Sequence, residues 1–172
     1  MIHSLTKDEL KRLLSAAKEE NQLHWLAIIV AFTHGLRASE VCEMTAGQIK
    51  DGYLTVKRKK GSLQTTQKLI GEETEPLESL VFGRDKNFRL FPWTTRWFQK
   101  LVHKYGEKAG IPYHKSTPHK LKHTCAMLGI EGGIKIHELQ QKLGHKNLDS
   151  TGQYLKINDD QAGEAWRKAV GL

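Results

Sequence analysis

One short stretch of strand-like sequence, set among segments with helical spacing, constrains the fold of this chain more than any other feature. Residues 53–56 and 63–69 are rich in Thr and apolar residues, and the segment 57–62 between them is basic and contains a glycine. Two such runs joined by a glycine-containing turn predict a β-hairpin. Because the rest of the chain has a helical pattern, we expect an α+β fold that is mostly helical, with one small antiparallel β-sheet or hairpin.

Caps and glycines mark the ends of the expected helices. Thr6 and Glu9 have the spacing of a capping box, and apolar residues follow at helical intervals. Thr117 before Pro118 marks another helix start, and the glycine pair 132–133 marks the end of that helix. The acidic segment 71–76 is expected to be a loop. The other expected helices are 22–33, a short helix from about residue 38, 95–108, 136–142, 147–154 and 160–170.

The chain has the length of one domain with its own core. Its 172 residues correspond to about one domain, and no apolar run approaches the ~20 residues that a membrane span needs. The N-terminus carries no apolar signal segment. Cys42 and Cys125 are far apart and form no C-x-x-C motif, which favours a reducing compartment over a disulfide or a zinc site. We therefore expect a single domain over residues 1–172, no membrane association and a cytoplasmic location.

The charge balance points to a polyanionic partner. Lys and Arg number 27 and Asp and Glu number 19, which gives a net charge of +8, and the pI is about 9.5. A basic compact domain of this kind favours nucleic acid first among possible partners.

Arg37 is the first candidate for binding a phosphate. It follows Gly35 at the expected start of a short helix. Its planar guanidinium can donate hydrogen bonds to two phosphate oxygens at once. The alternative is an exposed arginine paired with Glu40, three residues further along the helix.

The basic hairpin turn is the second candidate site. It contains Lys57, Arg58, Lys59 and Lys60 in succession. A lysine on such a turn can enter a DNA groove or donate a proton, whereas the alternative is a solvated charged turn.

The helix that begins at Pro118 presents a third candidate. His119 shares a helical face with Lys122 and with His123, at spacings of three and four residues. A neutral histidine beside a cation suits proton transfer near a phosphate. The two histidines lack the glutamate of an H-E-x-x-H metal motif, and we expect no metal. We expect His123 to pack its ring in the core and His119 to face the site.

The last candidates lie near the C-terminus. Gly144 marks a helix end, which places His145 at a turn, and Tyr154 follows nine residues later. A phenol with a pKa near 10 is a poor nucleophile unless cations surround the phosphate that it attacks. The alternatives are a surface histidine and a tyrosine that packs its ring at a helix end.

Taken together, in this order and at these spacings, the segments resemble the tyrosine recombinase (phage integrase) family. The resemblance runs from Leu5 to about Ile157. Segments 34–42 and 59–61 are especially similar to the short recombinases that invert fimbrial promoters. The matching pieces are Gly-Leu-Arg-x-Ser-Glu at 35–40, the basic hairpin, His-x-Leu-x-His-Thr at 119–124, Leu-Gly-His at 143–145 and the tyrosine nine residues later.

The resemblance implies an enzyme that recombines DNA at specific sites. Tyr154 matches the nucleophile, which forms a 3′-phosphotyrosyl bond and releases a 5′-hydroxyl. Arg37 matches the first phosphate-clamping arginine, and His145 matches the residue that hydrogen-bonds a non-bridging oxygen. His119 matches the histidine that takes the proton of the nucleophile.

The hairpin lysine of the family protonates the leaving 5′-oxygen. Lys60 is our assignment for this role, and Lys59 is the competitor because the length of the turn varies. The side chains expected to contact DNA are Arg37, Lys57, Arg58, Lys59, Lys60, Lys120 and Lys146. Since positioned cations and hydrogen-bond donors can stabilise the transition state of phosphoryl transfer, no metal, ATP or other cofactor is implied.

Lys122 departs from the family pattern. The family has His-x-x-Arg at this motif, so Lys122 stands where a second clamping arginine is expected. A lysine keeps the charge and loses the bidentate fork. The loss of one such bond in the transition state costs about 2–4 kcal/mol. Lys122 is therefore natural to this branch of the family, an introduced change, or a sign of a decayed enzyme that binds DNA and cuts it poorly.

The organisation of the chain leaves further alternatives open. It begins at the first helix of the catalytic domain, without the N-terminal DNA-binding domain of most relatives, so it is either shortened or naturally single-domain. A tail helix within 155–172 either docks on a neighbouring protomer or packs on its own domain. We expect double-stranded recombination sites as partners, a free monomer and a tetramer on DNA, with accessory DNA-bending proteins as further candidates. The sequence leaves open whether recombination results in integration, excision or inversion. It also leaves open whether the source is bacterial or a phage.

Two other functions compete with recombination. One is a DNA-binding module of the same fold with weakened or lost catalysis. The other is relaxation of supercoils by a type IB topoisomerase, against which the short chain argues.

Overall fold

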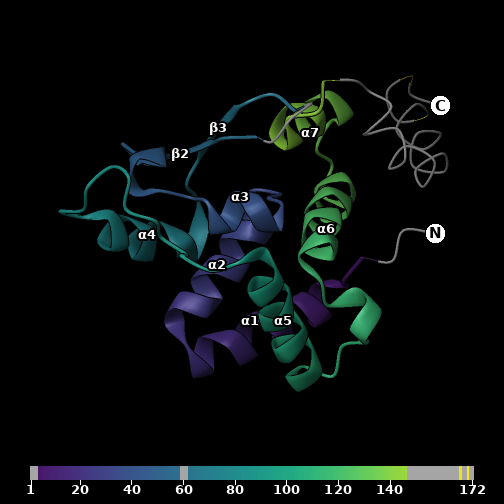
Figure 1. The fold of residues 1–172 in the computed structure, drawn as a ribbon. Coiled ribbons are helices and arrows are strands. Elements are labelled where there is room, and N and C mark those ends of the chain that lie inside the picture. Colours follow the sequence, from purple (N-terminus) through teal and green to yellow (C-terminus); the bar gives the residue numbers. More distant parts are fainter. Residues whose placement is uncertain (1–3, 59–61, 147–166, 168–169, 171–172) are drawn as a thin grey trace.

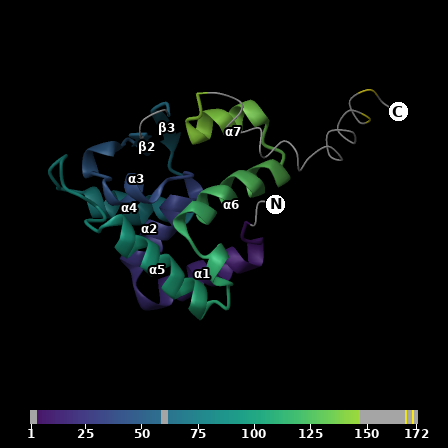
Figure 2. The same ribbon diagram turned by 45° about the vertical axis from the view of Figure 1, so that its right-hand side comes forward.

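The computed structural model of the protein describes residues 4–58, 62–146, 167 and 170, and these residues form a mostly helical α+β domain. The sheet and helix α7 (Ile136–Leu143) lie at one end of the molecule, and helices α1 (Lys7–Glu20) and α5 (Thr95–Lys108) lie at the other (Figure 1). The long helix α6 (Pro118–Glu131) connects the two ends (Figures 1 and 2). The other elements are α2 (Gln22–Thr33), α3 (Ala38–Cys42), η1 (Ala46–Gln48), β1 (Ile49–Lys50), β2 (Tyr53–Val56), β3 (Thr65–Lys68), η2 (Gly71–Glu73), α4 (Thr74–Val81) and η3 (Tyr113–Lys115).

Helix α2 forms the centre of the core because it is apolar around its whole circumference. Every residue from Trp25 to Ala31 is buried, which is typical of a helix surrounded by other elements. The amphipathic helix α1 packs against it, as does α6, and the amphipathic helix α5 packs on α1. The fully buried Tyr105 of α5 bonds through its hydroxyl to Nδ1 of His24, at 2.7 Å, so this large polar ring is satisfied inside the core.

The predicted caps are present. The Thr6 hydroxyl accepts a hydrogen bond from the Glu9 amide, and the Glu9 carboxylate accepts one from the Thr6 amide, so the capping box is complete. The Thr117 side chain also caps α6 by accepting a hydrogen bond from the Lys120 amide, with Pro118 in the first turn. The predicted ranges 22–33 and 95–108 are confirmed to the residue.

The sheet has three antiparallel strands in the order β1-β2-β3. The β2–β3 hairpin pairs Leu54 with Gln67 and Val56 with Thr65, and all four side chains are buried on the same face. The inner face of β3 is therefore polar. Gln67 is buried because it bonds to groups of α2 and α7, as described below.

Two predictions from the sequence are wrong. The acidic segment 71–76 is a loop only in composition, because η2 occupies 71–73 and α4 begins at Thr74. Pro76 is tolerated in the first turn of a helix, where its missing N–H has no intrahelical partner, and Leu77 is buried. The expected strand 63–69 is shorter, because Leu63 donates its amide to the Gly144 carbonyl at 2.7 Å instead of joining the hairpin.

Some predicted elements lie outside the described residues. The expected helix 147–154 is one of them. Of the expected helix 160–170, Arg167 and Val170 are described, and both are helical. None of the helices in the described part of the chain has the length and apolar character needed to cross a bilayer.

The packing of α1 makes a testable prediction. Leu13 is fully buried where α1 packs on α2 and α5, so Leu13→Ala removes apolar contacts and leaves a cavity. We expect this variant to lower the free energy of unfolding by about 2–5 kcal/mol, measured by urea denaturation. Lys11→Ala, on the exposed face of the same helix, should change it by less than about 0.5 kcal/mol. Equal effects of the two substitutions would contradict this packing.

Candidate active site

Arg37 is held at the start of α3 by the turn that precedes it. Gly35 has φ +62°, and a Cβ there would lie 2.6 Å from Leu143 Cδ2, so only glycine fits this turn. Glu40 accepts hydrogen bonds from the Arg37 amide at 2.8 Å and from Arg37 Nη1 at 3.2 Å. The Arg37 side chain is still 40% exposed. The pairing with Glu40 is therefore confirmed, and binding of a phosphate by the exposed part of the side chain stays a prediction.

His119 lies in the first turn of α6 and is exposed, whereas His123, one turn later, is buried as predicted. Their Nε2 atoms are 2.7 Å apart, within hydrogen-bonding distance. Burial lowers the pKa of His119, and the charges of Lys120, Lys122 and Arg37 lower it further. His119 is thus held in the neutral form, which can accept a proton.

Lys122 is a buried ammonium in the same part of the site. Its residue is 6% exposed, and Nζ has no hydrogen-bond partner among the described residues. Burial lowers the pKa of Lys122 to about 8, and the nearby charges of Arg37 and Arg58 add to this, against the opposing effect of Glu40. A buried ammonium without a partner is costly, so its surroundings suit an anionic ligand.

Arg37, His119 and Lys122 line one groove. Its volume is about 450 Å³. Two elements provide these side chains, since Arg37 is the N-cap of α3 and the other two lie three residues apart on the same face of α6. The remaining residues of the lining are Ala38, Ser39, Thr95, Gln99, Thr117 and Pro118. Three of the residues predicted from the sequence are therefore brought together although they lie more than eighty positions apart at the extremes.

His145 follows the end of α7 and lies beside the hairpin. Gly144 caps α7 in the left-handed conformation, as predicted, and His145 forms an isolated β-bridge with Ser62. The Ser62 hydroxyl also lies 3.4 Å from Arg37 Nη1. Burial lowers the pKa of His145 to about 4, with further contributions from Lys122, Arg37 and Arg58. A pKa this low keeps the His145 ring neutral at pH 7.

Arg58 is a correction to the sequence analysis. We expected it to contact DNA from the hairpin turn, but its side chain is fully buried. The guanidinium donates to the Glu40 carboxylate at 3.0 Å and to the backbone carbonyls of Gly35, in the turn after α2, and of Lys142 in α7. Nothing of it is available to a ligand on the surface. A basic run does not reveal which of its members turns inward.

The other predicted residues fall into two groups. Lys57 and Lys146 are exposed, and Lys120 is partly exposed on the first turn of α6, so these three remain candidates for DNA contact. The nucleophile Tyr154 and the two hairpin lysines, Lys59 and Lys60, lie outside the described residues.

Glu40 and Gln67 are functional residues that the sequence analysis missed or underrated. Glu40 binds both Arg37 and Arg58, and Gln67 links the ends of α2 and α7. The spacing of Arg37 and Glu40 signalled the first pair. For Gln67 the only signal in the sequence is the alternation of inward and outward side chains along a strand, which places Gln67 on the same face as Thr65. A polar side chain on the inner face of a sheet needs hydrogen-bond partners.

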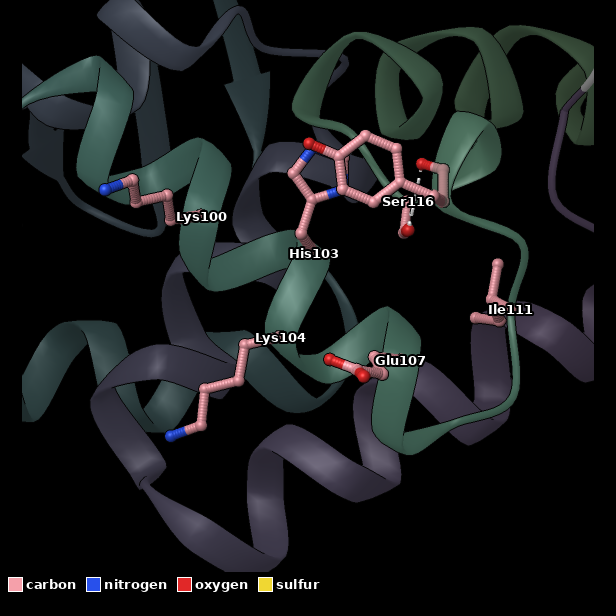
Figure 3. A pocket seen from close by; sticks show the side chains of 7 residues that line it. Lys100, His103, Lys104, Glu107, Ile111 and Ser116 are labelled. Atoms are coloured by element: carbon pink, nitrogen blue, oxygen red, sulfur yellow. Dashed lines mark hydrogen bonds between the residues drawn. The ribbon is translucent and has the colours of Figure 1, made fainter.

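A second pocket on α5 contains none of the predicted residues (Figure 3). His103 stacks on Tyr113 there, with ring centroids 3.8 Å apart. Lys100 and Lys104 point away from the histidine ring (Figure 3), and Lys104 is paired with Glu20. This pocket therefore lacks the converging cations of the groove. In the described ranges 4–58 and 62–146, no group of three His, Cys, Asp or Glu side chains is arranged to hold a metal ion.

Comparison with known proteins agrees with this geometry. The family model described as "Phage integrase family" matches residues 3–161. The chain belongs to the phage integrase family. Tyrosine recombinase XerA of Thermococcus kodakarensis is 32% identical over 178 residues, which cover 96% of this chain and 62% of the relative. This phage integrase family chain thus spans less than two thirds of the length of that relative.

Shorter relatives and solved structures give the same result. The type 1 fimbriae regulatory protein FimB of Escherichia coli K12 is 26% identical, over 97% of this chain and 90% of the relative. The crystal structure of XerA recombinase matches with a TM-score of 0.79 and 28% identity, over 98% of this chain and 64% of that one. The catalytic domain of bacteriophage HP1 integrase shares the fold, with a TM-score of 0.72 at 24% identity over 97% and 95% of the two chains.

The buried histidines predict how stability depends on pH. Burial lowers the pKa of His123 to about 4, and the charges of His119, Lys120 and Lys122 contribute. At a pH between the ordinary histidine pKa of about 6.5 and the lowered pKa of about 4, His123 is protonated in the unfolded chain and neutral in the folded chain. The stabilisation is therefore complete above the unfolded value and is lost as the pH falls.

We expect the urea midpoint to fall on acidification from about pH 7 to about pH 4.5. In His123→Phe, which has no imidazole to protonate at this position, the urea midpoint should depend less steeply on pH. An unchanged slope in the variant would contradict a neutral buried His123.

Proposed function

We propose that this chain is the catalytic domain of a tyrosine-type, site-specific DNA recombinase. The observation that carries the proposal is the convergence of Arg37, His119 and the unpartnered Lys122 ammonium on one groove. Membership of the phage integrase family and relatives named tyrosine recombinases support it. The domain is proposed to extend over residues 1–172, and its site of action is the cytoplasm.

In the proposed reaction the scissile phosphate occupies the groove. Arg37 and Lys122 bind its non-bridging oxygens, and the neutral His145 donates a hydrogen bond to one of them. Three cationic side chains around a single carboxylate, Glu40, leave an excess of positive charge that a phosphate neutralises. Such preorganised donors stabilise the charge that develops in the transition state.

The proton transfers complete the proposed cycle. The Tyr154 oxygen attacks phosphorus while its proton passes to His119, and the bond from phosphorus to the 5′-oxygen breaks. Lys60, or its neighbour Lys59, protonates the leaving oxygen, so that a 3′-phosphotyrosyl bond and a 5′-hydroxyl result. Attack by a second 5′-hydroxyl reverses these steps and joins new strands, so the energy of the bond is conserved without ATP.

Strand exchange on paired sites requires several copies of the chain. Lambda integrase, which shares the fold at 23% identity and a TM-score of 0.70, has been solved as a tetramer bound to a Holliday junction. By this analogy we propose that four copies act on two double-stranded sites through a four-way junction. Lys57, Lys120 and Lys146 supply DNA contacts, and binding should weaken steeply with salt.

Covalent trapping tests this function. The chain is mixed with nicked duplexes from the ends of the genetic element that encodes it, and the products are run on a denaturing gel. We expect a protein–DNA adduct that is lost in Tyr154→Phe, because the phenolic oxygen is the nucleophile, while DNA binding by gel shift is retained.

Absence of an adduct on a bound duplex, even in Lys122→Arg, would contradict the enzyme and leave a DNA-binding module of the same fold. Site-independent relaxation of supercoiled plasmid would indicate a topoisomerase instead.

Lys122 predicts an unusual loss of activity at alkaline pH. Because its pKa is lowered to about 8 by burial and by the neighbouring arginines, the free protein loses this charge above that pH. We expect kcat/KM for cleavage, which reports the free enzyme, to fall above about pH 8. In Lys122→Arg the fall should disappear, since a guanidinium stays protonated. Parallel pH profiles for the two proteins would show that Lys122 does not contact the phosphate in its charged form.

A further inference from the structure

We propose that Arg58 is a positioning residue that fixes three motifs of the active site relative to one another. This inference rests on the proposed function for its catalytic consequence, but its structural part can be tested without catalysis. The motifs are the Arg37 turn, the hairpin and the segment that carries His145. Nothing in the family resemblance singles out Arg58, since the basic turn was assigned to DNA contact as a whole.

The first link runs from Arg58 to Arg37 through a shared carboxylate. Glu40 is 4% exposed, and its Oε2 accepts from Arg58 Nη1 at 3.0 Å and from the Arg37 amide at 2.8 Å. Its Oε1 accepts from Arg37 Nη1 at 3.2 Å. Arg58 therefore holds the carboxylate that orients Arg37, while Arg37 alone reaches the groove.

The second link ties the hairpin to the turn before Arg37. Arg58 Nη1 also donates to the Gly35 carbonyl at 3.1 Å, and Nη2 lies 3.4 Å from the His34 carbonyl. These carbonyls belong to the two residues that follow the last residue of α2. The guanidinium thus holds the turn from which the Arg37 motif leaves.

The third link reaches the end of α7. Arg58 Nη2 donates to the Lys142 carbonyl at 2.8 Å. A Cβ at Gly144, two residues later, would lie 3.1 Å from both Cγ and Nε of Arg58 and 2.5 Å from the Leu63 carbonyl oxygen. The chain therefore passes directly over the arginine just before it reaches His145.

The geometry explains why an arginine is needed. Four acceptors from three elements surround one planar group, and a lysine has a single nitrogen that cannot satisfy acceptors on both sides of it. Burial lowers the pKa of Arg58, and the neighbouring Glu40 carboxylate opposes this effect. Removing one partner leaves an uncompensated buried charge, so any test must separate loss of position from loss of stability.

The experiment compares Arg58→Gln with the intact chain. Single-turnover formation of the covalent adduct is measured at saturating nicked duplex, and the dissociation constant of the duplex is measured separately. We expect the rate to fall by about 100-fold, as for a displacement of about 1 Å, while affinity changes by less than about threefold. The rate of adduct formation in Arg58→Lys should lie between those of the intact chain and Arg58→Gln. Methylguanidinium added to Arg58→Ala should restore part of the rate.

Two control variants separate the alternatives. Leu13→Ala loses stability in the remote core, so it reports what destabilisation alone does to the rate. Arg84→Gln removes one exposed positive charge, so it reports the effect of net charge on affinity. Neither side chain lines the groove, and both variants should retain the cleavage rate of the intact chain.

A second readout does not depend on chemistry. Hydrogen exchange of the Leu63 amide, which donates to the Gly144 carbonyl, reports whether the hairpin and the His145 segment stay together. Exchange at Leu63 should be faster in Arg58→Gln than in Leu13→Ala. If the intact chain forms no adduct, the proposed function fails and this exchange test still decides the positioning role.

Three results would overturn the inference. They are unchanged exchange at Leu63, a cleavage rate no lower than that of Leu13→Ala, and a loss confined to DNA affinity with a reduced salt dependence. The last would return Arg58 to the DNA-contacting residues.

Discussion

The buried ion pair between Arg58 and Glu40 is the interaction on which the rest of the site depends. Its partners are 3.0 Å apart with side chains that are 0% and 1% exposed. A pair this deeply buried has paid a large desolvation cost, and replacing it with apolar residues often stabilises a protein. Its retention is explained by geometry, because the pair joins the Arg37 turn, the hairpin and the end of α7.

A second set of hydrogen bonds, centred on Gln67, joins the same segments as the ion pair. Gln67 donates to the carbonyls of His34 and Lys142, and Lys142 Nζ donates back to the Gln67 amide oxygen at 2.9 Å. The apolar cluster between α6 and α7 holds these two helices together from the other side. The site is therefore held together by the hydrogen bonds of Arg58 and Gln67 and by the apolar packing between α6 and α7. Under the proposed function, a phosphate in the groove would be surrounded by His119, His145, Arg37 and Lys122.

The sequence predicts the helices well because their signals are local. The capping box at Thr6, the Pro118 start and the apolar run of α2 each specify a boundary without tertiary help, and all three are confirmed. The family resemblance likewise located Arg37, His119 and Lys122 before their groove was known. The acidic start of α4 was missed because its composition is that of a loop, whereas the residues that pack against the core, Leu77, Leu80 and Val81, come later in the helix.

Arg58 could not be assigned from the sequence. Four consecutive basic residues look equivalent in the sequence, and the inward direction of Arg58 depends on acceptors that lie eighteen to eighty-four positions away. The same holds for the shortened strand, since Leu63 pairs with Gly144 across the fold. Long-range acceptors of this kind leave no periodicity in the local sequence.

A structure of the chain bound to a nicked duplex would test the central claim most directly. The account predicts a backbone phosphate in the groove, with non-bridging oxygens in hydrogen-bonding distance of the Arg37 guanidinium and Lys122 Nζ, and Arg58 still buried against Glu40. A duplex that leaves this groove empty, or an Arg58 that has turned outward to the DNA, would contradict it.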